Sequence, residues 1–498
     1  MKPFATFNLA RAFSLYFILC FFVFKSSAQV GIGNTDPHAS SMLDISSDSQ
    51  GILIPRMTTA DRTAIATPAN SLMVFDTDER AYYYYDEPNT IWIRINSSRD
   101  LRDNFVLVKE LADFPAPAGG VITLDTNTFY EINGTINLGA NTIHLNNAYV
   151  AGMDANEDRL IRAGGPIFSG STGGSIKQLT LLGGGGASSA FNITGATGQR
   201  LLLQNTIVAN FSSVGTLSGL ALFFSNIVQF SNNTAGIVYN NIGTLLLSNQ
   251  AWFGDNGGSF ETLTGTFDLV QKVSGFSTVP GGATGFNVAS NPTVGEGILL
   301  STLFTGAGTY VNRYTTAYPG FNFNNNWVVN APGIPRESDN EATGNIYFNG
   351  ALATGFAQNI PTSLNEPFNL NSNTTTLAPN NFRVTSPANN RLTYQGRRTQ
   401  TFQVNATLAV RANSSSTTNL FFSFFFRKNG TETLVPTNTV VRTPAGFGAG
   451  SEIISLSISG TVELAPGEYI EIWGQRLTGN ATVSSPQLAI FAVNMNMK

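Results

Sequence analysis

Short runs of apolar residues alternate with glycine, asparagine and threonine through the middle of the chain. One such stretch, Gly134 to Gly152 (GTINLGANTIHLNNAYVAG), places large apolar side chains among uncharged polar residues and contains one histidine. Each run is short, is flanked by turn formers and does not sustain the i, i+3, i+4, i+7 spacing of an amphipathic helix, so the pattern predicts strands. The same pattern of short apolar runs recurs between residues 175 and 273 as SIKQLTLLG, QRLLLQNTIVAN, GLALFFSNIVQF, GTLLLSNQAWF and GTFDLVQKV.

These runs recur with a period of roughly 20 residues, which is typical of a solenoid. If each turn of a coil lies on the one before, inward side chains stack into a continuous apolar core, and Gly, Asn and Thr at the corners accept unusual dihedrals. We therefore predict an all-β protein with a right-handed parallel β-helix over residues 116–330. The repeat is marked by Leu181, Leu203, Leu222, Leu245 and Phe267.

The last segment, residues 391–498, shows longer alternating strands joined by turns such as Asn429-Gly430 and Pro466-Gly467. This pattern predicts an antiparallel sandwich of the jelly-roll kind. In LFFSFFF both sides of one strand are apolar, and one sandwich core needs only one of them. We expect the second side to be buried against neighbouring subunits, with a capping loop as the alternative. The two sides are Leu420, Phe422, Phe424 and Phe426, and Phe421 and Phe425.

The first 28 residues have the features of a secretory signal peptide. Lys2 and Arg11 precede an apolar run, and Ser26-Ser27-Ala28 fits a cleavage site. The run, residues 13–24, is shorter than the roughly 20 residues that span a bilayer, so we expect cleavage and no transmembrane segment afterwards. An uncleaved anchor and a lipoprotein modified at Cys20, the only cysteine, are the alternatives. The mature chain then has no disulfide.

Three further segments complete the expected organisation. Residues 29–98 contain breakers such as Gly33 and Pro55, short strands at Leu72–Phe75 and Tyr82–Tyr85, and little apolar mass. Such a segment needs association with copies of itself to bury enough surface, so we expect an attachment or trimerisation module. Residues 99–115 are expected to be a linker. Residues 331–390, rich in Asn, Pro and Thr, are expected to form an extended neck.

The chain carries little charge. Charged residues make up 12% of the sequence, against about 25% in a typical soluble protein, and the net charge is -4. No basic field is present that would attract nucleic acid. Between residues 163 and 330 the charged residues are few. This favours a trimer whose copies cover part of the coil, and a solitary β-helix is the alternative. These residues are Lys177, Arg200, Asp255, Glu261, Asp268, Lys272, Glu296 and Arg313.

Few residues are candidates for chemistry. Glycosidic cleavage needs two carboxyl groups about 5 to 10 Å apart, and in the predicted coil Asp255, Glu261 and Asp268 are the main acids. We interpret them as solvated turn acids. We therefore predict no catalytic residue, with a β-helical polysaccharide lyase or glycoside hydrolase as the alternative.

Other candidates also have ordinary structural interpretations. Neither His38 nor His144 has a nucleophile motif or a second imidazole nearby. Asp154 to Asp158 (DANED) spaces oxygen ligands like a calcium loop, but Arg159 stands where that loop needs glycine. The row Tyr82 to Tyr85 could stack on sugars, although packing around a trimer axis is the preferred interpretation. We predict no metal and no cofactor.

Two segments resemble known families. VGIGNTDPHASSMLDISSDSQGILIPRMTTADRTAI, followed by LMVFDTD and IWIRI, resembles the N-terminal segment of many exported proteins of a group of Gram-negative bacteria and of tail-fibre-like proteins of their phages. The resemblance implies an attachment or trimer-starting module without catalytic residues. The strand order of the last hundred residues, with VELAPGEYIEIWGQ before the last strand, is similar to tumour-necrosis-factor-like and complement-type heads and to the heads of phage and viral fibres. This similarity implies a jelly-roll trimer.

Together these features predict a secreted or cell-surface fibrous protein that forms a homotrimer and resembles phage tail fibres and tailspikes. Its expected role is adhesion or receptor binding without catalysis, with a cell-surface or environmental glycan as the candidate partner. A carbohydrate-active enzyme and a purely structural matrix component are the alternatives.

Overall fold

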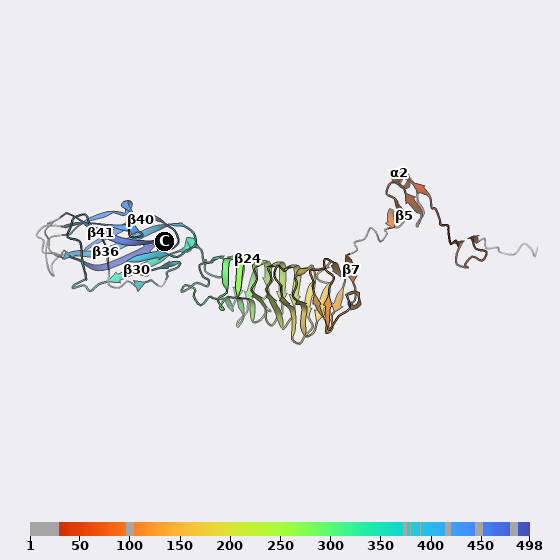
Figure 1. Cartoon of the computed structure of the whole chain (residues 1–498), viewed down its shortest axis with the longest axis horizontal. Helices are drawn as coiled ribbons and strands as arrows, with labels where there is room; N and C mark the ends of the chain where they lie inside the picture. Colours follow the sequence, from red (N-terminus) through yellow and green to blue (C-terminus); the bar gives the residue numbers. More distant parts are fainter. Residues whose placement is uncertain are drawn as a thin grey trace, which may run out of the picture. The chain divides into compact units, whose positions relative to one another are not determined.

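The computed structural model describes residues 29–95, 104–371, 376–378, 380–388, 390–413, 420–443, 452–478 and 487–498 (Figure 1). The chain divides into two compact units, Met1–Asp103 and Asn104–Lys498. The expected signal peptide, with Cys20, lies outside the described residues. None of the helices in the described part of the chain has the length and apolar character needed to cross a bilayer.

The first unit is a small β module. β1 (Val30–Ile32) and β2 (Leu43–Ile45) form a parallel pair, and a separate four-stranded sheet has the order β3-β4-β5-β6. Thr58 caps the short helix α2 (Thr59–Thr63): its hydroxyl accepts the N–H of Asp61, whose carboxylate accepts the N–H of Thr58. The sheet consists of β3 (Arg56–Met57), β4 (Met73–Asp76), β5 (Ala81–Asp86) and β6 (Ile91–Ile95).

This module buries little within one chain. Among the described residues of this unit, the buried apolar cluster consists of Val74, Ala81 and Tyr83. A set of apolar side chains before the sheet is more than half exposed, which is unusual for residues of this type in a self-sufficient domain. The module therefore leaves apolar surface that a single chain does not cover. The exposed residues are Val30, Ile32, Met42, Leu43, Ile52 and Leu53.

The second unit begins with a coil of strands that form two long sheets. Neighbouring strands in both sheets are parallel, so the predicted parallel β-helix is confirmed. The fourteen-stranded sheet contains β7 (Phe105–Val108), β9 (Phe129–Ile132), β10 (Thr135–Asn137), β12 (Tyr149–Gly152), β13 (Arg159–Arg162), β15 (Gly174–Lys177), β16 (Thr180–Gly183), β18 (Arg200–Ala209), β20 (Leu222–Ser231), β22 (Thr244–Trp252), β24 (Thr266–Val279), β26 (Thr293–Leu300), β27 (Leu303–Gly306) and β29 (Trp327–Asn330). The nine-stranded sheet contains β8 (Val121–Thr123), β11 (Thr142–His144), β14 (Gly165–Gly170), β17 (Ser188–Thr194), β19 (Ser213–Ser218), β21 (Ile237–Asn240), β23 (Ser259–Thr264), β25 (Thr284–Asn287) and β28 (Thr309–Asn312).

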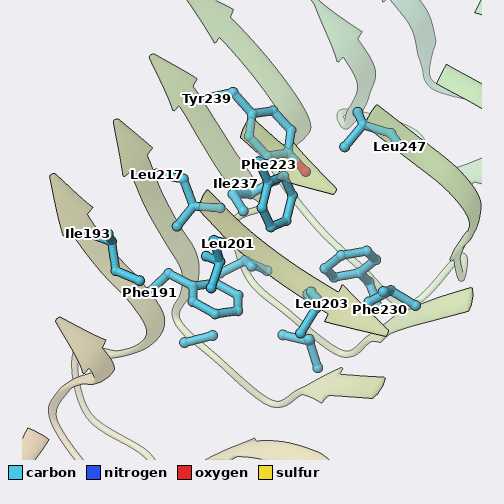
Figure 2. Packing of buried hydrophobic residues seen from close by; sticks show 14 of the residues in the cluster. Phe191, Ile193, Leu201, Leu203, Leu217, Phe223, Phe230, Ile237, Tyr239 and Leu247 are labelled. Atoms are coloured by element: carbon cyan, nitrogen blue, oxygen red, sulfur yellow. The ribbon is translucent and has the colours of Figure 1, made fainter. Parts of the chain in front are cut away.

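The stretch from Gly134 to Gly152 supplies three strands of this coil, β10, β11 and β12. Ile136, Ile143 and Val150, one from each strand, are buried. Each strand pairs with the strand that follows it one turn later, because β10 contacts β13, β11 contacts β14 and β12 contacts β15. Figure 2 shows the same arrangement further along, where Leu201, Leu203 and Phe223 contribute to one interior.

The register corrects the expected repeat. Leu201, Phe223, Leu245 and Val270 are neighbours on successive turns, which are therefore 22, 22 and 25 residues long. The residues expected to be equivalent fall in different positions: Leu222, for example, pairs with Arg200 and Thr244 outside the core. Loops of different lengths join the strands, so a fixed period cannot keep one position in register.

The coil also starts earlier than expected. β7 lies inside the segment 99–115 that we expected to be a linker, and it pairs in parallel with β9. Val108 at its end is fully buried. β7 belongs to the coil because it pairs with a strand of the next turn. Its short sequence alone does not indicate this pairing.

Two antiparallel sheets follow, as expected for a jelly-roll sandwich, and they enclose a second apolar core. η2 (Leu111–Asp113), η3 (Asp339–Glu341) and η4 (Val435–Thr437) are short 3₁₀ turns in this unit. One sheet contains β30 (Gly344–Asn349), β31 (Phe356–Asn359), β33 (Thr376–Leu377), β36 (Gln400–Asn413), β40 (Ile454–Leu464) and β42 (Gln487–Met497). The other contains β32 (Pro367–Asn369), β34 (Val384–Thr385), β35 (Arg391–Tyr394), β37 (Leu420–Lys428), β38 (Glu432–Thr433), β39 (Thr439–Thr443) and β41 (Tyr469–Thr478).

The described residues of the segment 331–390 do not form the expected extended neck. β30 and β31 from this segment pair with β42, and β32 pairs with β41. Their partners lie more than a hundred residues later in the chain. Long-range pairing makes these short strands part of the head, although their Asn- and Pro-rich surroundings are typical of a linker.

The double-sided apolar strand LFFSFFF is β37, and the structure corrects its expected role in part. Its first side, which begins with Leu420 and Phe422, lies in the head core as predicted. On the other side Phe425 is only 3% exposed in the single chain, and the Arg427 guanidinium lies 5.8 Å from its ring centroid. Phe425 therefore needs no second subunit. Phe421, at 37% exposed, is the residue on this side with uncovered surface.

Candidate functional site

The three candidate acids of the coil do not meet at one site. Asp255 is exposed in the loop after β22, where its carboxylate accepts the hydroxyl of Ser231 at 2.6 Å. Asp268 is exposed on the outer surface of β24. Glu261, in contrast, is fully buried, so our interpretation of it as a solvated turn acid is wrong. Because Glu261 points into the coil and Asp268 points outward, these two carboxylates cannot act on one substrate.

Glu261 belongs to a polar network inside the coil. The Lys272 ammonium lies 2.8 Å from Glu261 Oε2 and donates to Gln250 Oε1 at 3.0 Å. Gln250 in turn donates to Ser225 Oγ at 2.8 Å. Burial raises the pKa of Glu261, and the charge of Lys272 opposes that rise. Both charged side chains are at most 1% exposed, so the network has no access for a substrate and its role is internal.

Sequence reasoning missed Lys272 because charge normally marks an outward position. The signal was its spacing: Lys272 follows Val270 by two residues, and alternate residues of a strand share a side. The register places Lys272 beside the interior position of Leu247 on the preceding turn. A lysine at an inward position of this coil requires a buried acid, which Glu261 supplies.

The expected calcium-like loop is held by backbone donors. Asp158 accepts the N–H groups of Gly134, Met153 and Asp154 at 2.7 to 2.9 Å. Burial alone would raise the pKa of Asp158, but these donors outweigh it and lower that pKa. Its oxygens are therefore occupied by donors. Within the described ranges no group of three or more His, Cys, Asp or Glu side chains is arranged to hold a metal ion.

Each of the two histidines has a hydroxyl partner. His144 is half-buried in the coil, and its Nε2 lies 3.0 Å from the hydroxyl of Thr172. His38 is exposed in the first unit, where its Nδ1 lies 2.7 Å from the hydroxyl of Ser40. Neither contact contains an acid or a second imidazole. His38 contacts a residue of its own turn, and His144, at the end of β11, contacts a residue 28 positions later in the chain.

The tyrosine row of β5 is only partly covered within its own chain, because Tyr82 is 44% exposed. Tyr83 is buried beneath the Arg62 guanidinium, which lies 3.9 Å from its ring centroid. Arg62 also donates to Asp76 at 2.9 Å. Burial alone would raise the pKa of Asp76, but donation from Arg62, Thr59 and two backbone N–H groups lowers it to about 2. The two outer tyrosines contact aromatic neighbours edge-on, Tyr82 with Phe75 and Tyr85 with Trp92.

The coil carries an open groove of about 500 Å³ on its fourteen-stranded sheet. Tyr149, half exposed, stands at its edge, and the small residues Gly174 and Ser175 form its hollow. Polar groups surround the ring, but the lining contains no carboxylate, so this groove lacks the acid pair that glycosidic cleavage needs. Its lining residues are Asn127, Asn147, Tyr149, Gly174, Ser175, Gly198, Gln199, Arg200 and Leu202.

A second hollow of about 260 Å³ lies in the second unit between the last turn of the coil and the head strands. Arg383 is buried there, pairs with Asp339 and donates to the backbone carbonyl of Trp327. The backbone N–H groups of Arg397 and Arg398 also donate to Asp339, at 2.9 to 3.2 Å. These charges are directed at each other and at the backbone, so the cluster joins segments of the fold.

Residues 31–135 match the family model of the phage tail like trimerisation region. The match begins in the first unit and continues through β7, β8 and β9 to the start of β10, so it includes the first strands of the coil. It covers about a fifth of the chain. A comparison with curated proteins finds no match.

Comparison with solved structures finds matches of low sequence identity and low TM-score. A tailspike protein of Acinetobacter phage vB_ApiP_P1 is 9% identical, with 88% of this chain and 100% of that chain covered and a TM-score of 0.28. ORF18 of Geobacillus virus E2 is 12% identical over 87% and 91% of the two chains, with a TM-score of 0.21. Murine APRIL is 9% identical over 31% of this chain and 98% of its own, with a TM-score of 0.20.

Proposed function

We propose that this chain is the subunit of a homotrimeric fibre of the phage-tail type, which is anchored by its N-terminal module and binds a partner outside the cell without cleaving it. The observation that carries the proposal is the match of residues 31–135 to a trimerisation region. The exposed apolar residues of the first unit support it, because association with other copies would bury them. Export through the signal peptide and a secreted or cell-surface location are part of the same proposal.

The arrangement of acids supports binding rather than cleavage. Glu261 is buried inside the coil with Lys272. Asp268 lies on the outer surface of β24, and Asp255 lies in a loop. The lining of the open groove beside Tyr149 contains no carboxylate. A long surface rich in uncharged amides and hydroxyls suits a neutral polar partner, and we propose glycan as its class.

Two measurements on the mature chain test this proposal. Light scattering should give a particle mass three times the mass of one chain. A panel of bacterial capsule and other extracellular glycans should show binding, while the same glycans should yield no new reducing ends and no unsaturated products after long incubation.

Product formation would contradict the non-catalytic role. In that case Asp255→Asn and Asp268→Asn would identify which exposed acid participates. Glu261 is unsuitable for this purpose because its substitution disturbs the interior of the coil.

A further inference from the structure

One outer row of the coil is mostly apolar. The parallel register connects ten residues, one from each of the ten strands on the main path of the fourteen-stranded sheet from β7 to β29. Eight of them are apolar, Ser175 and Gln271 are polar, and none is charged. Their neighbours along each strand point into the core, so these side chains point outward. We call this set the apolar row: Phe105, Phe129, Tyr149, Ser175, Leu202, Phe224, Leu246, Gln271, Ile298 and Val328.

The apolar row is partly uncovered in the single chain. Phe105 is 42% exposed, Tyr149 is 50% exposed and Val328 is 39% exposed. The remaining members are half-buried by their neighbours in the ladder. Exposed apolar surface that continues over many strands marks an interaction site.

Adjacent outer rows extend this surface. Leu222 and Leu269 lie on one side of the apolar row, and Val273 and Leu300 lie on the other. Four charged residues stand in these flanking rows, beside the apolar row, which is the usual arrangement of an apolar interface centre with a polar rim. The flanking charges are Glu131, Lys177, Arg200 and Glu296.

The other sheet of the same coil has a different outer surface. Its equivalent row consists of uncharged polar residues and one valine, although these residues occupy the same kind of outward position. Coil formation alone therefore does not require apolar residues outside. We call this set the polar row: Ser169, Asn192, Thr216, Val238, Thr262, Asn287 and Asn312.

The apolar row is continuous with the matched trimerisation region. Its first two members, Phe105 and Phe129, lie within residues 31–135, and the ladder then continues without a break of register to Val328. If three copies begin in parallel at this region, the same residue of each copy lies at the same height along the coil. A row that is parallel to the common axis then meets its own counterpart at each level.

Two hollows open on this same surface. The groove at Ser175 lies between Tyr149 and Leu202, and a smaller hollow of about 130 Å³ is lined by Phe224 and Leu246. We infer that the apolar row is the surface by which the coils of three copies pack on one another, with its hollows accepting side chains of the other copies. This inference rests on the proposed function and specifies which side of the coil is buried.

Single cysteine variants test the inference. The natural Cys20 is first replaced by serine, so the introduced thiol is the only one. Leu246→Cys places it on the apolar row, and Thr262→Cys places it at an outward position of the polar row as the matched control. After mild oxidation we expect disulfide-linked chain pairs from Leu246→Cys and none from Thr262→Cys. In the reduced trimer, maleimide should label Leu246→Cys at least tenfold more slowly.

A second pair of variants uses charge in place of a thiol. Phe224→Asp should lower the particle mass toward that of one chain, or make the coil region of the trimer more susceptible to proteolysis. Thr216→Asp should leave both the mass and the susceptibility unchanged. Far-UV circular dichroism of each variant checks that the coil is still folded.

The outcomes separate the two proposals. A wild-type trimer with fast labelling at Leu246→Cys and crosslinking at Thr262→Cys would overturn the apolar row while keeping the trimer. A wild-type particle mass equal to that of one chain would overturn the trimer itself. A Tyr149→Ala variant that loses glycan binding while Leu246→Cys stays freely labelled would identify the row as a ligand surface and overturn the inference.

Discussion

Phe224 and Leu246 lie side by side on the outside of β20 and β22, while Phe223 and Leu245, the preceding residues, lie side by side in the core. These strands are thus apolar on both sides, which explains the nearly continuous apolar runs that they show in the sequence. The two sides have different partners: the inner pair packs within its own coil, and the outer pair is available to another chain.

The adjacent residues Leu245 and Leu246 separate these two roles. Leu245→Ala should destabilise the coil by about 2 to 5 kcal/mol, because it leaves a cavity at a fully buried position. Leu246→Ala removes a half-buried side chain, so its effect on folding should be much smaller and its effect on assembly larger. Denaturant unfolding at fixed protein concentration, together with light scattering, measures both. Equal losses of folding stability in the two variants would contradict the assignment of inner and outer sides.

The buried pair Lys272 and Glu261 should be sensitive to removal of one partner. Glu261→Ala should cost about 3 to 5 kcal/mol, because it leaves the Lys272 ammonium buried without its acid. Replacing both with apolar residues, in Glu261→Leu with Lys272→Met, should restore most of this loss. Thermal unfolding of the three proteins gives the comparison, with the exposed Lys177→Met as the control. A double variant as unstable as the single one would show that the charges have another role.

Glu337 should make the end of the coil sensitive to pH. Burial raises the pKa of Glu337 to about 7, although the N–H groups of Asn322 and Phe323 donate to its carboxylate and oppose the rise. A raised pKa in the folded state favours the protonated form, so its contribution to stability is complete below about pH 4.5 and is lost as the pH rises through 7.

The unfolding temperature of the wild type should therefore fall between pH 5 and pH 9 more than that of Glu337→Gln, which stays neutral. The exposed Glu341→Gln is the matched control and should follow the wild type. Parallel curves for the wild type and Glu337→Gln would exclude this source of pH dependence.

In the head, Phe425 and Phe421 should respond differently although they lie on the same side of β37. Phe425→Ala should destabilise the head by about 3 to 5 kcal/mol, because Phe425 is buried within one chain. Phe421→Ser should change the folding of the head little, since its ring is 37% exposed. Unfolding followed by near-UV circular dichroism distinguishes the two, and a large loss from Phe421→Ser alone would show that a neighbouring chain covers it.

The sequence reveals the coil because its corners need particular residues. Asn205 and Asn249 occupy the left-handed region at equivalent corners, with φ of 49° and 48°, and asparagine accepts this conformation more readily than most residues. Ile227 stands at the corner between them with φ of 55°, an unusual choice for a β-branched residue. The recurrence of Asn, Gly and Ser between apolar runs therefore identifies turns, even where one corner departs from the rule.

Long-range pairing is what the sequence could not provide. Nothing near Asn345 indicates that β30 pairs with β42, which lies at the other end of the head. Glu261 likewise resembles a turn acid until the next turn of the coil places Lys272 beside it. The distinction between Phe421 and Phe425 also depends on neighbouring segments, because alternation assigns both to the same side of the strand.

The mass of the mature protein in solution tests the account most directly. The matched region at residues 31–135, the exposed apolar residues of the first unit and the apolar row all lead us to expect three chains in one particle. Multi-angle light scattering over a hundredfold range of protein concentration should give, at every concentration, a particle mass three times that of one chain. A single chain mass at every concentration, with the coil folded, would contradict the account.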